Sequence, residues 1–262
     1  MDFRTKYGPW ALIAGASEGL GAAWAQALAR RGLNLILLAR REAALAQTAT
    51  AVRERHQVEV VTVVVDLASP GLGETLAPAL QGREVGLYVH NAAFAPHGEF
   101  LGRPLAEHLR SLDVNCRAPL LLGHRLGSAM AARGRGGIVL MSSLTAFQGT
   151  PLLSTYGATK AFALVLAEGL HGELSPRGVE VLACCAGATR TPGFLRSVPE
   201  GAPGQLEPDQ VVEEALGQLG RRAFTIPGIF NRFVSFVMRR LLPRNTTVNL
   251  LARQARRLRV SP

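Results

Sequence analysis

Cysteine, lysine and long apolar runs are all scarce in this 262-residue sequence. The three cysteines, Cys116, Cys184 and Cys185, form no CxxC or Cys/His spacing, so neither a zinc site nor a disulfide framework is expected. No run of about 18 apolar residues exists, which argues against a membrane-spanning helix. The first residues lack the apolar core of a secretion signal. We therefore expect a cytoplasmic protein with reduced thiols and no resident metal.

Acidic residues are absent from the last 48 positions, and this places the whole net charge of +10 at one end of the chain. Residues 1–214 carry 19 basic and 19 acidic side chains, whereas residues 215–262 carry ten arginines and no acid. These arginines are not interleaved with a recognisable nucleic-acid module, so a nucleic-acid binder is not favoured. Lys6 and Lys160 are the only lysines, which makes a lysine at a chemically meaningful spacing less easily accidental.

The apolar content, 48% of the residues, is ample for a core and excludes a disordered chain. Short apolar runs alternate with longer helical stretches. The expected strands cover 10–14, 33–38, 59–65, 85–90, 137–141 and 179–185, and the expected helices cover 19–31, 42–56, 71–80, 104–132 and 155–174. Runs that are apolar at consecutive positions are typical of strands buried on both faces. The alternation predicts an α/β fold with a doubly wound parallel sheet of Rossmann type in three layers.

The domain organisation predicted is a single sheet domain over 1–227 followed by a basic helical extension over 228–262. Residues 187–208 are rich in proline and glycine and are expected to form a long substrate loop. A helix near 209–220 and a short strand near 224–226 should complete the domain.

The extension contains an amphipathic pattern. Phe230, Phe233, Val234, Val237 and Leu241 recur at helical spacing, and Arg232, Ser235 and Arg239 fall on the opposite face. Pro243 should end this helix, and a second basic stretch follows over 250–259. Two interpretations stay open. The apolar face packs on the domain with the arginines solvated, or the basic helices contact an anionic partner, such as a membrane surface, an acidic carrier protein or a coenzyme A phosphate.

A glycine-rich turn, Ala14-Gly15-Ala16-Ser17-Glu18-Gly19-Leu20-Gly21, connects the first strand to the first helix. Glycine allows a tight turn and a close approach to a pyrophosphate, while the helix N-terminus supplies N–H donors. The spacing is GxxxGxG, which a purely structural turn would also produce. After the second strand stands Arg40, where an acid would bind the ribose of NAD; arginine suits the additional phosphate of NADP.

Tyr156 and Lys160 are four residues apart and would share one helical face. A tyrosine and a lysine at this spacing, without other motifs, are usually a packed aromatic ring beside a solvated lysine. The context favours chemistry here, because an ammonium favours the phenolate and makes tyrosine a usable proton donor and acceptor. Ser143 ends one strand and Asn91 follows another at the edge where parallel sheets bind ligands. Asn115 lies in a helical stretch, where asparagine is a poor helix former.

With these motifs the chain resembles the short-chain dehydrogenase/reductase family over residues 8 to 195. The resemblance rests on the glycine-rich turn, Asp66-Leu67, His90-Asn91-Ala92-Ala93, Asn115, Ser143 and the Tyr156/Lys160 pair. Two departures occur. His90 and Ala93 stand where the family usually has asparagine and glycine, and Ala186-Gly187 replaces the usual Pro-Gly.

The resemblance implies a set of roles. Tyr156 is the general acid and base, Lys160 lowers its pKa and binds the nicotinamide ribose, Ser143 binds the substrate oxygen, and Asn115 holds a relay water. Arg40 would select NADP(H), Asp66 would bind the adenine, and Thr189 and Thr191 would orient the carboxamide. The implied cofactor contacts are Gly15, Ser17, Glu18, Gly19, Leu20, Gly21, Arg40, Asp66, Leu67, Asn91, Ala92, Ala93, Tyr156, Lys160, Gly187, Thr189 and Thr191.

The predicted function is an NADP(H)-dependent ketoreductase that interconverts a carbonyl and a secondary alcohol. The alternative is a non-catalytic NADP-binding regulator or interaction protein that keeps the fold. Apolar side chains near the expected site indicate a hydrophobic substrate, such as a ketone, a 3-oxoacyl group or a steroid-like ring: Phe94, Leu144, Phe147, Leu152, Leu153 and Phe194. By resemblance a homodimer or homotetramer would form through the helices 104–132 and 155–174.

Overall fold

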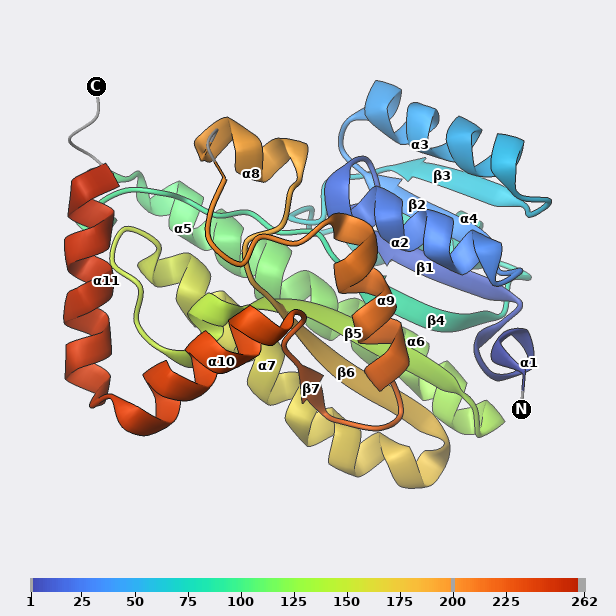
Figure 1. Cartoon of the computed structure of the whole chain (residues 1–262). Coiled ribbons are helices and arrows are strands. Elements are labelled where there is room, and N and C mark those ends of the chain that lie inside the picture. The colour runs from blue at the N-terminus through green and yellow to red at the C-terminus, as the bar shows by residue number, and fades with distance from the viewer. Residues whose placement is uncertain (1, 199–200, 259–262) are drawn as a thin grey trace.

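A seven-stranded parallel sheet forms the centre of the molecule, as the computed structural model shows for residues 2–198 and 201–258 (Figure 1). The strands are β1 (Trp10–Ala14), β2 (Asn34–Ala39), β3 (Val60–Val64), β4 (Val85–His90), β5 (Gly136–Ser143), β6 (Val179–Ala186) and β7 (Phe224–Thr225). Their order is β3-β2-β1-β4-β5-β6-β7. The direction of winding reverses between β1 and β4, and such a reversal is where open α/β sheets bind ligands. The predicted fold class is confirmed.

Helices cover both faces of the sheet and make three layers (Figure 1). The first eight are α1 (Phe3–Tyr7), α2 (Gly19–Arg30), α3 (Glu42–Arg55), α4 (Leu72–Leu80), α5 (Leu105–Leu112), α6 (Ala118–Arg133), α7 (Ser154–Leu174) and α8 (Pro192–Ser197). The others are α9 (Pro208–Gln218), α10 (Ile229–Phe236) and α11 (Arg244–Leu258). Apolar residues of α2, α3 and α9 pack on one face, and those of α4, α6 and α7 pack on the other.

The strands are apolar on both faces because each face has its own core. Cys184 of β6 belongs to the cluster beneath α2, α3 and α9, while its neighbour Cys185 belongs to the cluster beneath α4, α6 and α7. The edge strand β3 differs, since only Val60 is buried and the side chains of residues 61–64 alternate between partly exposed and exposed.

Two segments differ from their predictions: one predicted helix is divided in two, and the predicted loop contains a short helix. The helix predicted over 104–132 is interrupted by a π-helical turn, Asp113–Arg117, which separates α5 from α6. The predicted loop 187–208 contains the short helix α8, and Thr191 caps it by accepting a hydrogen bond from the N–H of Phe194 at 3.2 Å. Proline follows that cap directly, as suits the first position of a helix.

The first helix of the extension, α10, packs its polar side on the domain and exposes much of its apolar side. The buried residues of α10 are Asn231 and Ser235, whereas Phe230 and Phe233 are exposed. The interpretation that the apolar face packs on the domain is therefore wrong. Asn231 explains the orientation, because its Nδ2 donates to the carbonyl oxygens of Gly204 and Pro227, each at 3.1 Å. A π-helical turn, Val237–Leu241, continues α10, and the helical run ends before Pro243 as predicted.

Within the described residues, no helix combines the length and the apolar character that crossing a bilayer requires. The last residue of the predicted basic stretch, Arg259, lies outside the described part of the chain.

Candidate active site

The carboxyl ends of the central strands bring the predicted site residues to one edge of the sheet. In the register, Ala14 of β1 lies beside His90 of β4, and Ser143 of β5 lies beside Ala186 of β6. The loops that follow these four strands therefore start at the same edge. The glycine-rich turn, the loop after β4, the residues after Ser143 and the substrate loop all meet there.

The glycine-rich turn requires glycine at three positions. Gly15 and Gly19 have φ values of +84° and +56°, which side chains rarely adopt. A Cβ at Gly21 would lie 1.9 Å from the carbonyl oxygen of Gly15. The turn is therefore shaped by its own backbone, as expected for a motif that lets a ligand approach closely.

The first turn of α2 fits a pyrophosphate. In this described turn no side chain caps the N-terminus and no acidic residue is present, so the N–H groups and the positive end of the helix dipole face the glycine-rich turn. Glu18 precedes the helix, and its carboxylate lies 3.0 Å from Arg41 and 3.0 Å from Arg196. Burial alone would raise the pKa of Glu18, but these two arginines outweigh it and hold the pKa below its usual range. The carboxylate charge is thus balanced where a phosphate would sit.

Two arginines, not one, stand at the adenosine end of the site. Arg40 is exposed at the end of β2, and Arg41 turns back to the glycine-rich turn, where its Nη2 lies 3.3 Å from Ser17 Oγ. From the sequence, the phosphate role was predicted for Arg40 alone. The sequence signal for Arg41 was that a second arginine directly follows Arg40. The direction in which its side chain turns is seen only in the structure.

Asp66 is held in place by contacts on both carboxylate oxygens. Oδ1 accepts a hydrogen bond from the N–H of Ala68 at 3.0 Å, and Oδ2 lies 2.7 Å from Nη2 of Arg110. Burial raises the pKa of Asp66, yet these two partners outweigh burial and keep the pKa below its usual value. The next residue, Leu67, packs its side chain in the core, so only its backbone faces the site.

The loop after β4 supports the glycine-rich turn from below. Asn91 donates from Nδ2 to the carbonyl oxygen of Gly15 at 2.7 Å, so its side chain serves the turn. Ala92 lies directly against Gly15, where a Cβ on the glycine would meet the Ala92 backbone at 2.6 Å. Ala93 is exposed and is not among the positive-φ positions, so alanine causes no backbone strain in place of the usual glycine.

Tyr156 and Ser143 form the reactive pair. Tyr156 lies in the first turn of α7 and is half-buried. Burial raises the pKa of its phenol, and a hydrogen bond offered by Ser143 acts in the opposite direction. Two hydroxyl groups therefore face the same point, from β5 and from α7.

Lys160 is buried beneath Tyr156. Its Nζ lies 5.5 Å from the centre of the Tyr156 ring and donates to the carbonyl oxygen of Met141 at 2.7 Å. Burial lowers the pKa of Lys160 to about 8. The expected lowering of the Tyr156 pKa by Lys160 is not what the structure shows, because the ammonium turns toward the Met141 carbonyl and burial dominates at the phenol.

Asn115 lies in the π-helical turn and links this turn to the loop after β4 and to α7. Its Oδ1 accepts from the N–H of Phe94 at 2.8 Å, and its Nδ2 lies 2.9 Å from the carbonyl oxygen of Phe94 and 2.9 Å from Thr159 Oγ1. Thr159 in turn donates to the carbonyl oxygen of Tyr156 at 2.8 Å. Asn115 therefore fixes the loop after β4 against the helix that carries Tyr156, and its water-binding role stays a prediction.

His90 belongs to a buried chain that the sequence did not indicate. Its Nε2 lies 3.1 Å from the carbonyl oxygen of Val114, an acceptor, and its Nδ1 lies 2.7 Å from the hydroxyl of Tyr88. Nε2 must carry the proton, so Tyr88 donates to Nδ1 and the ring is neutral. Burial and the charge of Lys160 lower the pKa of His90 to about 3. The substituted histidine thus supports the same π-helical turn that carries Asn115.

The substrate loop rests on the glycine-rich turn. Thr191 packs against Gly19, where a Cβ on the glycine would lie 2.8 Å from Thr191 Cγ2. Thr189 is buried and donates to the carbonyl oxygen of Gly187 at 3.1 Å. Among the predicted cofactor contacts Gly187, Thr189 and Thr191, it is Thr191 that packs against the glycine-rich turn. The Thr189 hydroxyl forms its hydrogen bond within the substrate loop.

The arrangement is suited to proton transfer at a bound oxygen. The phenol of Tyr156 can give or take the proton, and the Ser143 hydroxyl can hold the same oxygen. Beside them lies a turn shaped for a dinucleotide. The two halves together are what a hydride-transfer enzyme requires.

Comparison with known proteins agrees with this geometry. Residues 9–200 match the family model described as short chain dehydrogenase. The 7beta-hydroxysteroid dehydrogenase of Collinsella aerofaciens is 34% identical over 238 residues, which cover 88% of this chain and 90% of that protein.

Solved structures give the same result. A 7beta-hydroxysteroid dehydrogenase studied for its stereoselectivity is similar with a TM-score of 0.91 and 31% identity, over 96% of this chain and 100% of that one. A short-chain dehydrogenase from Sphingobium yanoikuyae in complex with NADPH has a TM-score of 0.76 and 33% identity, over 84% of this chain and 87% of that one.

Proposed function

The chain belongs to the short-chain dehydrogenase family, and from this premise we propose that it is an NADP(H)-dependent oxidoreductase that interconverts a carbonyl and a secondary alcohol on a bulky hydrophobic substrate. The observation that carries the proposal is the pairing of Tyr156 with Ser143 above the buried Lys160. That pairing lies beside a glycine-rich turn whose helix N-terminus is uncapped by side chains.

The residues of this chain handle the proton and the orientation of the substrate. The nicotinamide cofactor, when bound, would supply or accept the hydride. Ser143 holds the substrate oxygen by a hydrogen bond, and Tyr156 exchanges its phenolic proton with that oxygen. Lys160 lies beneath the Tyr156 ring, with its Nζ on the Met141 carbonyl oxygen, and burial lowers the pKa of Lys160 to about 8. Asn115 and Thr159 keep the first turn of α7 in position.

Two arginines support NADP(H) as the cofactor. Position 39 is an alanine, so no acidic side chain there would repel a 2′-phosphate. Arg40 and Arg41 both follow β2 at the adenosine end. Arginine binds phosphate oxygens through two parallel N–H donors, which favours the phosphorylated cofactor.

Replacing Arg40 or Arg41 by alanine should weaken NADPH binding by about 1–3 kcal/mol each, the range for a charge-assisted hydrogen bond. NADH affinity should barely change for Arg40→Ala, because NADH has no 2′-phosphate. Arg41→Ala also removes a partner of Glu18 beside the glycine-rich turn, so it should weaken NADH binding as well, but less than NADPH binding. Fluorescence titration of both cofactors measures this, and Arg55→Ala, on the exposed part of α3, is the matched control. Equal affinities of the wild-type protein for NADPH and NADH would refute NADP selectivity.

The substrate is proposed from the apolar lining and from the relatives. Phe94, Leu144, Phe147, Leu152, Leu153 and Phe194 are all partly exposed. Similar proteins are named 7beta-hydroxysteroid dehydrogenase, which supports a rigid, polycyclic carbonyl or alcohol. A screen of NADPH oxidation over polycyclic ketones, including 7-oxo steroids, simple ketones, aldehydes and 3-oxoacyl thioesters tests this. Turnover of the small or acyl substrates alone would redirect the substrate class.

The alternative, a non-catalytic NADP-binding protein, is less well supported. Such a protein needs the turn and the arginines for binding, but it has no need of Tyr156, Ser143 and a desolvated lysine. The same screen separates the two, since the alternative predicts NADPH binding without oxidation of NADPH on any carbonyl.

Self-association through α5, α6 and α7 remains part of the proposal. Exposed apolar residues lie on these helices: Leu105, Leu109, Leu112, Leu120 and Val165. Their burial against a second copy would remove apolar area from water.

A further inference from the structure

The helix α10 turns its apolar face away from the protein. Asn231 and Ser235 are 4% and 6% exposed, whereas Phe233 and Phe236 are 65% and 56% exposed. An ordinary surface helix does the reverse, with the apolar side on the core. The orientation is fixed by the two hydrogen bonds of Asn231, by the ion pair of Arg232 with Glu214 at 2.9 Å, and by Arg239, whose guanidinium lies 4.0 Å from the centre of the Phe147 ring.

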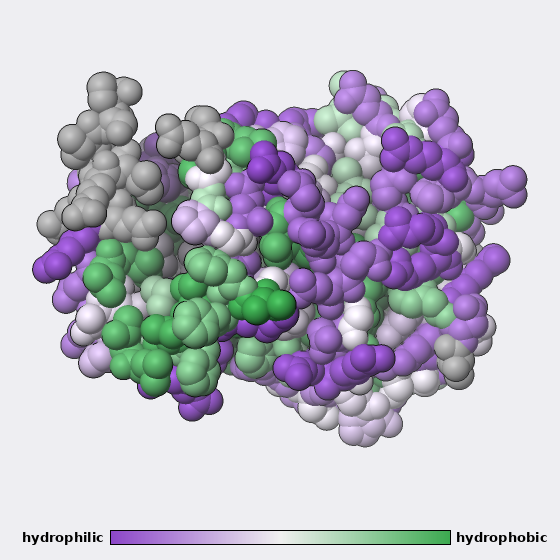
Figure 2. Space-filling model, in the orientation of Figure 1, coloured by the Kyte–Doolittle hydropathy of each residue, from purple (hydrophilic) through white to green (hydrophobic). Residues whose placement is uncertain are grey.

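The exposed side chains form one continuous surface, which we call the α10 face. Its members are Ile229, Phe230, Phe233, Phe236 and Leu241. In Figure 2 hydrophobic residues gather over α10 and the adjoining part of the extension, and hydrophilic residues lie to the right of them and below. Apolar patches of this kind on soluble proteins mark interaction sites.

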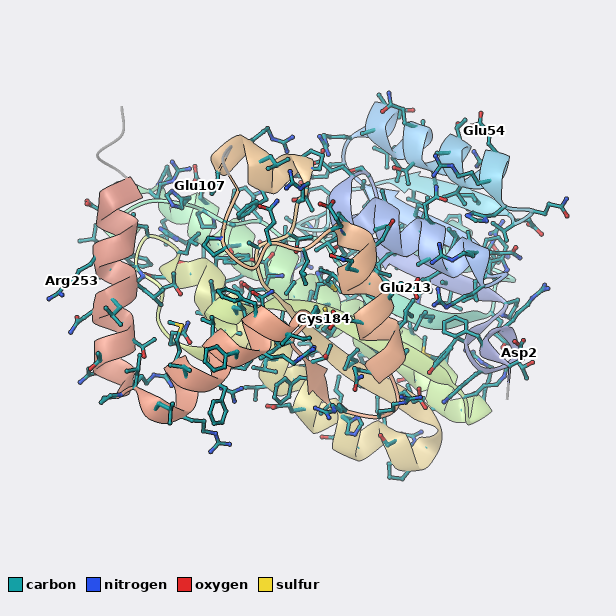
Figure 3. All side chains as sticks on the ribbon, viewed as in Figure 1. Asp2, Glu54, Glu107, Cys184, Glu213 and Arg253 are labelled. Carbon is teal, nitrogen blue, oxygen red and sulfur yellow. The ribbon has the colours of Figure 1, made fainter. Side chains whose placement is uncertain are left out.

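Arginines border the α10 face. An open cavity of about 730 Å³ lies beside Phe236, and Arg221, Arg222, Arg239 and Arg240 line it. Glu168 of α7 also lines this cavity. On α11, Arg253 points away from the domain (Figure 3). From residue 215 onward the sequence contains ten arginines and no acid, so the extension itself contributes only positive charge; Glu168 and Glu214, which pairs with Arg232, come from the sheet domain.

This charge argues against a second copy of the chain as the occupant. A two-fold interface places the same surface on both sides. It would bring the arginines of one copy against those of the other with no acid from residues 215–262 to pair them. An occupant that is apolar inside and negative at its surface would match both the exposed apolar side chains and the bordering arginines.

We propose that the α10 face docks on the surface of an anionic lipid bilayer. Phe230, Phe233 and Phe236 would enter the boundary between headgroups and acyl chains, and the bordering arginines would contact lipid phosphates. The α10 face is fastened to the substrate loop through Asn231 and Gly204, so docking places that loop next to the bilayer. The proposal concerns binding alone and does not rest on the proposed reaction.

Cosedimentation of the full-length protein with vesicles tests the proposal. Vesicles of phosphatidylserine with phosphatidylcholine should bind the protein at low salt, and vesicles of phosphatidylcholine alone should bind it weakly. Raised salt should release most of the protein, because screening acts on the arginines. A protein that stays in the supernatant with the anionic vesicles at low salt overturns the proposal.

Two pairs of variants assign the binding to the α10 face. Phe233→Ser with Phe236→Ser should reduce partitioning by about tenfold or more, since each exposed ring loses apolar burial. Arg222→Glu with Arg240→Glu should reduce it by at least about 25-fold, because each arginine near an anionic surface is worth about fivefold and each added glutamate is repelled as well. Leu101→Ser and Arg55→Glu are the matched controls and should bind like the wild type; Leu101 is 94% exposed. Equal losses in the controls would show that the binding is not specific to this face.

A spectroscopic variant separates docking from self-association. Trp10 and Trp24 are buried, so Phe233→Trp adds the first exposed tryptophan. Its emission should shift to shorter wavelength with anionic vesicles, and it should be unchanged by protein concentration without lipid. A shift that follows protein concentration alone, together with a smaller oligomer for the Phe233→Ser and Phe236→Ser variant, would assign the face to a second copy and overturn the membrane proposal.

Discussion

Replacing Tyr156 by phenylalanine should reduce kcat by about 10²–10⁴-fold and leave NADPH binding nearly unchanged. The ring still fills its place beside Lys160, and the glycine-rich turn is untouched. Only the hydroxyl that faces Ser143 is lost, and with it the proton donor to the substrate oxygen. Single-turnover kinetics with a competent ketone, combined with cofactor titration, measures the two effects separately.

Tyr7 offers a matched control for this substitution. Its hydroxyl donates to Glu180 from α1, away from the carboxyl edge of the sheet. Tyr7→Phe should lower the free energy of unfolding but leave kcat close to that of the wild type. Near-wild-type turnover of Tyr156→Phe would contradict the assignment of the catalytic acid.

Gly21→Ala should have the second large effect, on folding and on cofactor affinity together. The added Cβ would lie 1.9 Å from the carbonyl oxygen of Gly15 and 2.9 Å from the Cα of Ala16, and both atoms belong to the backbone. Neither can rotate away, so the turn must open. We expect a loss of at least about 1–3 kcal/mol in the free energy of unfolding, the cost of overpacking a tight site, and loss of measurable NADPH binding. Denaturant titration and cofactor titration measure the two.

Gly169→Ala is the corresponding control on α7. Apart from its chain neighbours and the backbone of its own helix, no heavy atom lies within 4 Å of the position that its Cβ would take. Alanine in a helix interior should stabilise by up to about 1 kcal/mol. If Gly21→Ala also folded with wild-type stability and bound NADPH normally, the close packing of the turn would not be what the ligand requires.

The sheet and the site were predictable because their signals are local. Six of the strands are built around short, mostly apolar runs, and the order of helices and strands leaves few topologies for a parallel sheet. Tyr156 and Lys160 are linked by helical spacing, and Ser143 and Asn91 by their position after strands. In each case the backbone geometry alone brings the residues together.

The remainder depends on contacts between distant segments. Asn115 showed up as an unfavourable residue in a helix, but the π-helical turn also depends on its bonds to Phe94 and Thr159. His90 takes its role from the Val114 carbonyl, 24 residues away along the chain. The orientation of α10 could not be read from its periodicity, because periodicity defines two faces without saying which one is inside. Asn231 decides that through the Gly204 carbonyl.

The polar attachment of α10 has a consequence for how the molecule opens. Both buried residues of this helix are polar, so detaching it exposes little apolar surface and changes the heat capacity only slightly. The dependence of such an opening on denaturant is correspondingly small. Amide protons of α10 should therefore exchange with solvent by local opening, well before those of β1 or β4 exchange by global unfolding. The extension would then behave as a separate cooperative unit, although the chain runs from β7 into α10 with only a short connection.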